Sequence, residues 1–561
     1  MASPDHMPGS GQSAGSRRPR RRKAGKAKVV SLVAAGALAA GAAITVPLAL
    51  NAGQPEPRST PTSSASAAPA PSPKPVKKAG VAYYKQAGPQ ATATTAVPPM
   101  TVNVSAAELG TSLDPGAVGL SLEATDLADP AMSSANADLV ATLKGLGKPL
   151  LRFGGNAVDR RFFWTSTGEA MPGDRRGDKA HPVRTATPKD LERVKTLLDA
   201  IDGTINITVD LGHYDPARAA DMSKHAARIF GKRLVGITIG NEPNGYPDNG
   251  LRPGSWGIPD YLNELKSYAE AINSAAPGVP IIGPGTYSEA WWKAFAKTEL
   301  PQQRIVSFHY YPLSSCSGSE PGDEPTLANL MSDYMHPRVR DYDRRAMAPA
   351  AAAGLQTWLT ETGPSACPGS NPTTKNHASA LWYSEFALNG LQQGIKRLGF
   401  HSSLITCVGG PPLSPICSGG KYLQPDGAIR ENPSYFGLAM VSDLGTGKFL
   451  KLEQSGGGLS YAYAVKHRDG STNVYIANKN DPQKDAQASV TLSLPGKPKT
   501  GTMTQMAGPG YTAEGSTTID GRKALPVANN KRPMVMNFVE GSSVQKFPLT
   551  SGTVTVLHFT Y

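Results

Sequence analysis

The stretch Leu234-Val235-Gly236-Ile237-Thr238-Ile239-Gly240-Asn241-Glu242-Pro243-Asn244 joins an apolar, β-branched run to a polar turn. The run is typical of a buried strand, and the glycine, asparagine and proline after it are typical of a turn. The stretch Leu355-Gln356-Thr357-Trp358-Leu359-Thr360-Glu361-Thr362 has a similar order. In both, a glutamate follows the carboxyl end of an expected strand, where its side chain can point into a site rather than into the core.

Short apolar runs alternate with amphipathic stretches from about Val118 to Phe400. We expect strands at Val118–Leu122, Pro149–Phe153, Ile205–Leu211, Leu234–Ile239, Val279–Gly283, Arg304–Tyr310, Leu355–Thr360 and Arg397–His401. Expected helices include Pro188–Ile201, Pro216–Phe230, Pro259–Ala275 and Lys375–Leu391. Such repeats predict an α/β fold, a (β/α)₈ TIM barrel over residues 112–445. Active sites of these barrels lie at the carboxyl ends of the strands, so Glu242 and Glu361 are expected to share a pocket.

The pattern changes after about Lys448. The segments Leu459–Lys466, Thr472–Asn478, Ala488–Leu494 and Thr553–Tyr561 alternate in polarity or are rich in β-branched residues. They predict an appended antiparallel β-sandwich over residues 446–561. The strand-like segment within residues 99–111 precedes the barrel, and we expect it to join this sandwich.

The positive charge of the chain is concentrated at its start. Residues 1–80 carry +10 of the net charge of +13, so the remainder is close to neutral and a nucleic-acid partner is not expected. Residues 1–28 form a basic tail, 29–50 an apolar signal peptide or signal anchor, and 51–98 a disordered Pro/Ala/Ser-rich linker. We therefore expect a protein that is secreted or anchored on the extracellular side, with membrane contact only through residues 29–50.

The four cysteines, Cys316, Cys367, Cys407 and Cys417, all lie in the part expected outside the cell. An even count in an exported chain favours disulfides, with three possible pairings. Because Cys407 and Cys417 enclose a short Gly/Pro loop, we pair them, and Cys316 then pairs with Cys367. A zinc site is the competing interpretation, but the chain has no Cys-x-x-Cys spacing, and no metal is expected.

Two facing carboxyl groups are what the hydrolysis of a glycosidic bond requires. One group protonates the leaving oxygen, while the other attacks the sugar or activates water. This chemistry needs no cofactor. Taken singly, Glu242 could be a surface acid after a strand, and Glu361 an acid at a helix N-terminus.

Several motifs occur in one order along the chain: Leu151-Arg152-Phe153-Gly154-Gly155 with Asp159, Gly240-Asn241-Glu242-Pro243-Asn244, His309-Tyr310-Tyr311, and Trp358-Leu359 followed by Glu361-Thr362. This order resembles family 79 of the glycoside hydrolases, the heparanase and β-glucuronidase family, over about Val118 to Leu450. The resemblance implies a retaining β-glycosidase with Glu242 as general acid/base and Glu361 as nucleophile. It also implies a β-glucuronidase-like activity on glucuronide-containing glycans.

The resemblance further implies substrate contacts. Asn241 would contact the 2-hydroxyl of the sugar, Tyr310 would lie near the nucleophile, and Glu123 would bind sugar hydroxyls. Further expected substrate-binding residues are Asn156, Asp159 and Gly369. Core packing is the alternative for Tyr310, and a barrel-interior ion partner is the interpretation we favour for Arg152. The loop after Glu361 lacks the tyrosine that holds a uronic carboxylate in the family, so the reaction type is better supported than glucuronate specificity.

Two other functions remain open from the sequence. One is another retaining glycosidase of the same clan, similar to arabinofuranosidases or xylosidases. The other is a non-catalytic surface protein that binds glycans. In each case the expected partner is an oligosaccharide or polysaccharide, with or without uronic acids, and we expect a monomer.

Overall fold

The computed structural model describes residues 88–177, 182–316, 322–367, 372–404, 414–421, 424–521, 534–535 and 541–561. These residues belong to one compact unit, Pro75–Tyr561. The expected basic tail, the apolar segment 29–50 and the linker up to residue 87 lie outside the described residues. Within the described part, no helix combines the length and the apolar character needed to cross a bilayer.

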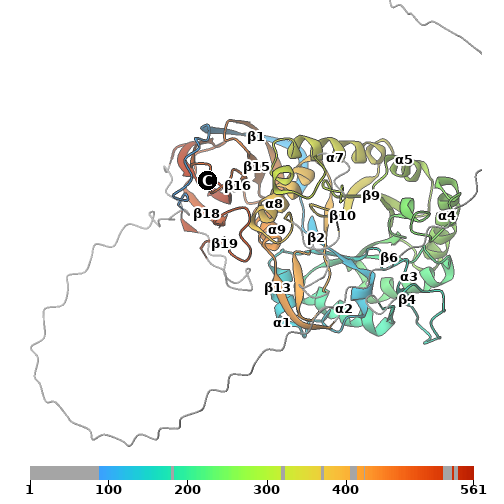
Figure 1. The fold of residues 1–561 in the computed structure, drawn as a ribbon. Coiled ribbons are helices and arrows are strands. Elements are labelled where there is room, and N and C mark those ends of the chain that lie inside the picture. Colours follow the sequence, from blue (N-terminus) through green and yellow to red (C-terminus); the bar gives the residue numbers. More distant parts are fainter. Residues whose placement is uncertain are drawn as a thin grey trace, which may run out of the picture. The chain divides into compact units, whose positions relative to one another are not determined.

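Eight parallel strands close into a barrel in the order β10-β11-β2-β3-β6-β7-β8-β9 (Figure 1). The strands are β2 (Val118–Glu123), β3 (Leu150–Gly154), β6 (Thr204–Val209), β7 (Leu234–Ile239), β8 (Ile281–Thr286), β9 (Gln303–Tyr310), β10 (Gln356–Thr362) and β11 (Arg397–His401). Each overlaps an expected strand, and the predicted (β/α)₈ barrel is confirmed.

Helices connect the barrel strands. They are α1 (Ala137–Lys144), α2 (Pro188–Ile201), α3 (Pro216–Phe230), α4 (Ile258–Ala275), α5 (Glu289–Lys297), α6 (Leu327–Leu330), α7 (Met335–Ala352) and α8 (His377–Gln393), and α9 (Pro433–Asp443) follows the last strand. The start of α2 has a clear chemical cause. Thr187 and Asp190 form a capping box, and Pro188 occupies the first turn, where it needs no amide hydrogen.

The barrel interior is polar near its carboxyl end. Ser121, Arg152, Asn206, Thr208 and Thr238 are all almost completely buried. Because strand side chains alternate between the two faces, the neighbouring apolar residues of these strands pack outward against the helices. Two short strand pairs, β4 (Phe162–Trp164) with β5 (Arg184–Ala186) and β12 (Ile416–Lys421) with β13 (Gln424–Glu431), lie outside the barrel sheet.

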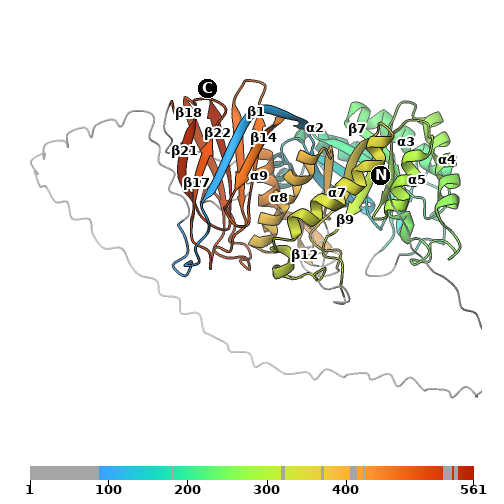
Figure 2. The same ribbon diagram turned by 90° about the horizontal axis from the view of Figure 1, so that it is seen from above.

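A second sheet of ten strands forms the appended domain. Its strands are β1 (Met100–Leu113), β14 (Gly447–Ser455), β15 (Ser460–Lys466), β16 (Thr472–Asn478), β17 (Ala488–Ser493), β18 (Thr500–Ala507), β19 (Thr518–Ile519), β20 (Met534–Val535), β21 (Val544–Leu549) and β22 (Thr553–Thr560). Most neighbours are antiparallel, as the predicted sandwich requires. Figure 2 shows β1, from the start of the described chain, lying among these late strands, where it pairs with β14 and β17.

A buried polar network joins the barrel helices to the sandwich. Glu385 on α8 accepts hydrogen bonds from Tyr463 of β15 at 2.9 Å and from Lys479 at 3.3 Å. His336 of α7 lies 2.7 Å from the same carboxylate. Lys479 is completely buried, so its charge is balanced by Glu385 rather than by water. The two domains are therefore linked by a specific ion pair as well as by apolar packing.

Candidate active site

Glu242 directly follows β7 and Gly240-Asn241. Its backbone is left-handed, with φ 49° and ψ 51°, a conformation that non-glycine residues rarely adopt. The Glu242 amide donates to the Gly285 carbonyl at 3.0 Å, which fixes the strained turn against the end of β8. Strain of this kind gathers at functional sites because the surrounding structure must hold it. The turn presents the Glu242 side chain at the carboxyl end of the barrel.

Glu361 lies near the end of β10, next to His309 of β9. The pairing between these strands shifts in register between Leu359 and Glu361. An irregularity of this kind re-aims the side chains beyond it. Thr362 secures the strand end by donating its hydroxyl hydrogen to the Tyr310 carbonyl at 2.7 Å. Glu361 thereby enters the barrel mouth from the side opposite Glu242.

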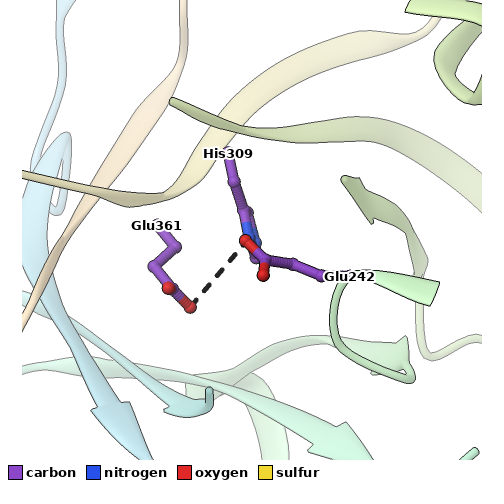
Figure 3. Close-up of side chains that lie close together, drawn as sticks. All are labelled: Glu242, His309 and Glu361. Carbon is purple, nitrogen blue, oxygen red and sulfur yellow. Dashed lines mark hydrogen bonds and ion pairs between the residues drawn. The ribbon is translucent and has the colours of Figure 1, made fainter. Parts of the chain in front are cut away.

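The two carboxylates point toward one another, and the His309 ring lies beside the Glu242 carboxylate (Figure 3). One oxygen of each glutamate and one ring nitrogen of His309 all lie within 4.8 Å of one another. His309 Nδ1 is 2.9 Å from Glu242 Oε1 and 4.0 Å from Glu361 Oε2. The Glu242 side chain is 19% exposed and that of Glu361 is 7% exposed. Both carboxylates therefore keep a small exposed surface.

Arg152 ties the two halves of the site together. Its Nη1 donates to Glu361 Oε2 at 2.7 Å and to Ser121, while its Nη2 donates to Asn241 Oδ1 at 2.6 Å. The guanidinium is completely buried, so these partners replace the water that it would otherwise bind. The favoured interpretation of Arg152 as a barrel-interior ion partner agrees with this contact, and the partner is Glu361 itself.

The Gly154-Gly155 pair makes room for two side chains of the site. A Cβ on Gly154 would come within 2.7 Å of the Arg152 guanidinium, and one on Gly155 within 2.6 Å of the Glu123 carboxylate. Gly155 also has a φ of +67°. Any larger residue at these positions would displace Arg152 or Glu123.

Tyr311, not Tyr310, contacts Glu361. The Tyr311 hydroxyl donates to Glu361 Oε1 at 2.8 Å. Tyr310 points away from the pocket and stacks on Tyr342 of α7, with ring centroids 3.7 Å apart. The expectation for Tyr310 is corrected by the alternation of side chains along β9: His309 faces inward, so Tyr310 must face the helices.

The charges around Glu361 favour its ionised form. Burial alone would raise its pKa, but the positive charges of His309, His401 and Arg152 and the hydrogen bond from Tyr311 outweigh burial and hold the pKa well below its usual range. Burial, followed by the charges of Glu361 and Glu242, raises the pKa of Tyr311 well above its usual value. Tyr311 therefore stays protonated and serves as a permanent donor to the Glu361 carboxylate.

The other expected substrate-binding residues differ in their positions. Asn241 is buried, and its Nδ2 has no hydrogen-bond partner among the described residues. Asn156 is exposed. Glu123 lies beside the pocket, where Oε2 accepts from the Ala157 amide at 2.9 Å and Oε1 lies 3.5 Å from His401. Gly369 lies outside the described residues.

Asp159 supports the backbone of the site and does not line the pocket. It is buried, and its carboxylate accepts from the amides of Leu211, Gly212 and Asn241 at 2.8–2.9 Å. Burial, followed by the charge of Asp210, raises its pKa to about 6. Asp159 thus holds the turn that carries Asn241, so it acts on the site through the backbone and not by touching the pocket.

The sequence reasoning did not single out His401 or Tyr311 as individual site residues. His401 ends β11 and faces Glu123; burial would lower its pKa, but the interaction with Glu123 at 3.5 Å and the charge of Glu361 raise it overall. Its position after the eighth barrel strand was the available signal, because that strand end also opens on the pocket. His213, in the turn after β6, contacts Asp210 and Arg175.

A disulfide joins the two loops on the Glu361 side of the site. Cys316, after β9, is bonded to Cys367, after β10, with Cα atoms 5.2 Å apart. This predicted pair is confirmed. For the second predicted pair, Cys407 lies outside the described residues. The Cys316–Cys367 bond fixes the loop that follows Glu361 to the neighbouring loop, and so restricts the movement of one wall of the pocket.

Glu242, His309 and Glu361 are also the one set of three close metal-ligand side chains found in the described residues. Carboxylate and imidazole donors at these separations would suit a divalent ion after a small contraction. However, the Glu361 oxygen nearest His309 already binds the Arg152 cation. The donor set therefore fits a proton-transfer pair better than a resident metal.

No family model matches the sequence, and no curated protein matches it. Solved structures do match the fold. A 4-O-α-L-rhamnosyl-β-D-glucuronidase from Fusarium oxysporum 12S is 18% identical, with 82% of this chain and 99% of that chain covered and a TM-score of 0.58. An α-L-arabinofuranosidase from Thermotoga maritima is 14% identical, with coverage of 82% and 99% and a TM-score of 0.59. A β-xylosidase from Caulobacter crescentus CB15 is 16% identical, with the same coverage and a TM-score of 0.53. The chain shares the fold of these glycosidases over almost their whole length.

Proposed function

We propose that this protein is a retaining glycoside hydrolase in which Glu361 is the nucleophile and Glu242 the general acid/base. The observation that carries the proposal is the approach of the two carboxylates, whose nearest oxygens lie within 4.8 Å. Retaining enzymes place their carboxyl groups about 5–5.5 Å apart, whereas inverting enzymes need about 6.5–9.5 Å to admit a water molecule. The likeness to glycosidase folds supports the same class.

In the first step, the ionised Glu361 attacks the anomeric carbon and the bond to the leaving oxygen breaks. Arg152 and Tyr311 keep the attacking carboxylate ionised and oriented. Glu242, in its protonated form, gives its proton to the leaving oxygen, and His309 fixes the position of the Glu242 carboxyl through the 2.9 Å hydrogen bond. The product of this step is a glycosyl ester on Glu361.

In the second step, Glu242 accepts a proton from a water molecule in the vacated position. The water attacks the anomeric carbon and releases Glu361, so the configuration of the sugar is restored. Arg152 binds Oδ1 of Asn241, which leaves the unpartnered Nδ2 as a donor for a hydroxyl of the bound sugar. This hydrogen bond would stabilise the transition state, because hydrogen bonds to a hydroxyl next to the anomeric carbon strengthen as positive charge develops on that carbon.

The test of the reaction type uses Glu361→Ala with an aryl glycoside. Turnover should fall by at least about 10⁴-fold, and added azide should restore part of it and give a glycosyl azide of inverted configuration. Glu242→Ala with azide should instead give an azide of retained configuration. Near-normal activity of Glu361→Ala without azide would overturn the nucleophile assignment.

We propose that the substrate is a glycan and that the sugar cleaved from it is β-glucuronide-like. Support comes from the sequence resemblance to family 79 and from the fold shared with a protein described as a rhamnosyl-glucuronidase. The cations Arg152 and His401 also lie at the pocket that would hold the sugar. Aryl β-glucuronide should be cleaved, and aryl β-glucoside, β-xyloside and α-L-arabinofuranoside should not.

The arabinofuranosidase fold matches this chain as well as the glucuronidase fold does, with TM-scores of 0.59 and 0.58, and the xylosidase fold matches it with a TM-score of 0.53. Cleavage of a neutral aryl glycoside in preference to the glucuronide would therefore replace the substrate proposal and leave the two-glutamate mechanism intact. Lack of hydrolysis on every glycan, with binding that persists in the Glu242→Gln/Glu361→Gln variant, would indicate the non-catalytic glycan-binding alternative. We also propose that the protein is exported and that it is a monomer.

A further inference from the structure

Tyr287 is a large aromatic side chain left half exposed at the catalytic end of the barrel. It follows the last residue of β8, Thr286, and is 53% exposed. A single exposed ring is common on protein surfaces, so what matters for Tyr287 is its position beside the turn that carries Glu242. Its backbone is held in place, because the Tyr342 hydroxyl donates to the Tyr287 carbonyl at 3.3 Å.

The ring lies beside the turn that carries Glu242. A Cβ placed on Gly245 would lie 3.3 Å from the Tyr287 hydroxyl oxygen. Gly245 ends the short helical turn Pro243–Gly245 that directly follows Glu242. The carbonyl of Gly285, two residues before Tyr287, accepts from the Glu242 amide. Tyr287 and the acid/base are thus two parts of one rigid junction between β7 and β8.

The electrostatic coupling agrees with this proximity. Burial, followed by the negative charge of Glu242, raises the pKa of Tyr287, while a hydrogen bond with the Asn244 side chain lowers it. Asn244 lies two residues after Glu242, and its Oδ1 is a buried acceptor with no hydrogen-bond partner among the described residues. An exposed ring and an unpaired acceptor therefore occur side by side next to the acid/base.

Glu242 marks the side of the pocket where the leaving group must lie, since it delivers a proton to the leaving oxygen. A sugar ring is the leaving group that matches both features, because it has an apolar face that can pack on an aromatic ring and hydroxyl groups that can donate. We propose that Tyr287 and Asn244 form the binding site for a leaving sugar, with the sugar face on the Tyr287 ring and one hydroxyl donating to Asn244 Oδ1. This inference rests on the proposed glycosidase function.

The site has a consequence for the choice of substrate. A leaving group that fills it gains binding energy in the transition state as the bond to it breaks, so sugar leaving groups should be preferred over groups too small to reach Tyr287. The protein would then act on bonds between two sugars rather than on glycosides of small alcohols. The nature of the sugar bound on the Glu361 side does not enter this argument.

The experiment compares two substrates with the same glycosyl group. β-D-Glucuronosyl fluoride has a leaving group of one atom, whereas a 1,4-linked disaccharide with a non-reducing β-glucuronosyl residue fills the proposed site. In Tyr287→Ala, the ratio of kcat/KM for the disaccharide to kcat/KM for the fluoride should fall about tenfold. Asn244→Ala should lower the same ratio. Tyr287→Phe keeps the ring, and its ratio should stay within about twofold of the wild type.

Tyr334→Ala is the matched control. Tyr334 is a tyrosine of similar exposure, 64%, at the N-cap of α7, and its removal should leave the ratio unchanged. If the ratio is unchanged in Tyr287→Ala, even when both kcat/KM values fall equally, the inference is overturned. Turnover of the fluoride by the wild type would still uphold the proposed function. Wild-type protein that cleaves neither substrate would overturn both for glucuronides.

Discussion

Arg152 donates to Glu361 Oε2 through Nη1 at 2.7 Å and to Asn241 Oδ1 through Nη2 at 2.6 Å. One buried guanidinium thus bridges the proposed nucleophile on β10 and Asn241, which follows β7 and immediately precedes the proposed acid/base. Because guanidinium is planar and its donors are fixed, it sets the distance between its partners as well as their charge. Arg152 thus connects Glu361 to the turn that carries Glu242.

Replacement of Arg152 by Gln should move the acid limb of the pH profile of kcat/KM to higher pH. The reason is that Glu361 reacts when ionised, and the loss of a cation at 2.7 Å raises its pKa. We expect kcat/KM at neutral pH to fall at least about 100-fold, because an uncompensated buried charge costs about 3–5 kcal/mol. Arg345→Gln, which removes an arginine in exposed ion pairs, should change neither quantity. An unmoved acid limb in Arg152→Gln would contradict this account of the charge balance.

The contrast between Tyr311 and Tyr310 gives a matched pair of variants. Tyr311→Phe removes the donor to Glu361, and kcat should fall about 10- to 100-fold, since a hydrogen bond to a charged group contributes about 1.5–3 kcal/mol. Tyr310→Phe leaves the stacking on Tyr342 in place and should keep kcat within about twofold. Steady-state kinetics on an aryl glycoside measures both. A larger effect at Tyr310 than at Tyr311 would instead support the original expectation that Tyr310 lies near the nucleophile.

Glu385→Gln should destabilise the protein without altering the catalytic groups. It leaves the completely buried Lys479 without its counter-charge, and the free energy of unfolding should fall by about 3–5 kcal/mol. Urea denaturation followed by fluorescence measures the change. Glu453→Gln, at an exposed position of β14, should stay within about 0.5 kcal/mol of the wild type. Equal effects of the two substitutions would show that the domain interface does not depend on this ion pair.

The same carboxylate predicts a pH dependence of stability. Burial would raise the pKa of Glu385, but Lys479, His336 and Tyr463 lower it overall to about 2. A depressed pKa means that the contribution to stability is present above the pKa of the unfolded chain, about 4.3, and is lost as pH falls toward 2. Thermal unfolding between pH 5 and pH 2 should therefore show a steeper loss in the wild type than in Glu385→Gln. Parallel pH curves for the two proteins would rule out this coupling.

The Cys316–Cys367 bond should stabilise the protein by roughly 2–4 kcal/mol, since it closes a loop with a sequence separation of 51 residues. Cys316→Ser, Cys367→Ser and the double variant should all lose about the same free energy of unfolding, because either single change breaks the same bond. The KM for substrate should also rise, as one wall of the pocket becomes freer to move. Additive losses in the double variant would mean that the thiols act separately.

The periodic pattern of the sequence was enough to predict the barrel strands, several helices and the appended sandwich. Local patterns determine these features, because strand side chains alternate and helices repeat with a period of 3.6 residues. The Glu242 and Glu361 positions followed from the same reasoning, since both follow the ends of expected strands. The Cys316–Cys367 pair also followed from the sequence, through the short Gly/Pro loop assigned to the other two cysteines.

The sequence did not determine which of two adjacent tyrosines faces the pocket. Both residues are tyrosines, so their type does not show which one faces inward. That depends on the register of β9 against β10, because a shift of one residue exchanges the two faces of the strand. His401 came to lie beside Glu123 only through barrel closure, which places the eighth strand beside the first, and Tyr287 came to lie beside the Glu242 turn because the fifth strand pairs with the fourth. Sequence alone therefore specified the elements and the two acids, while the contacts around those acids were decided by the tertiary structure, because they join residues whose proximity exists only after the barrel closes.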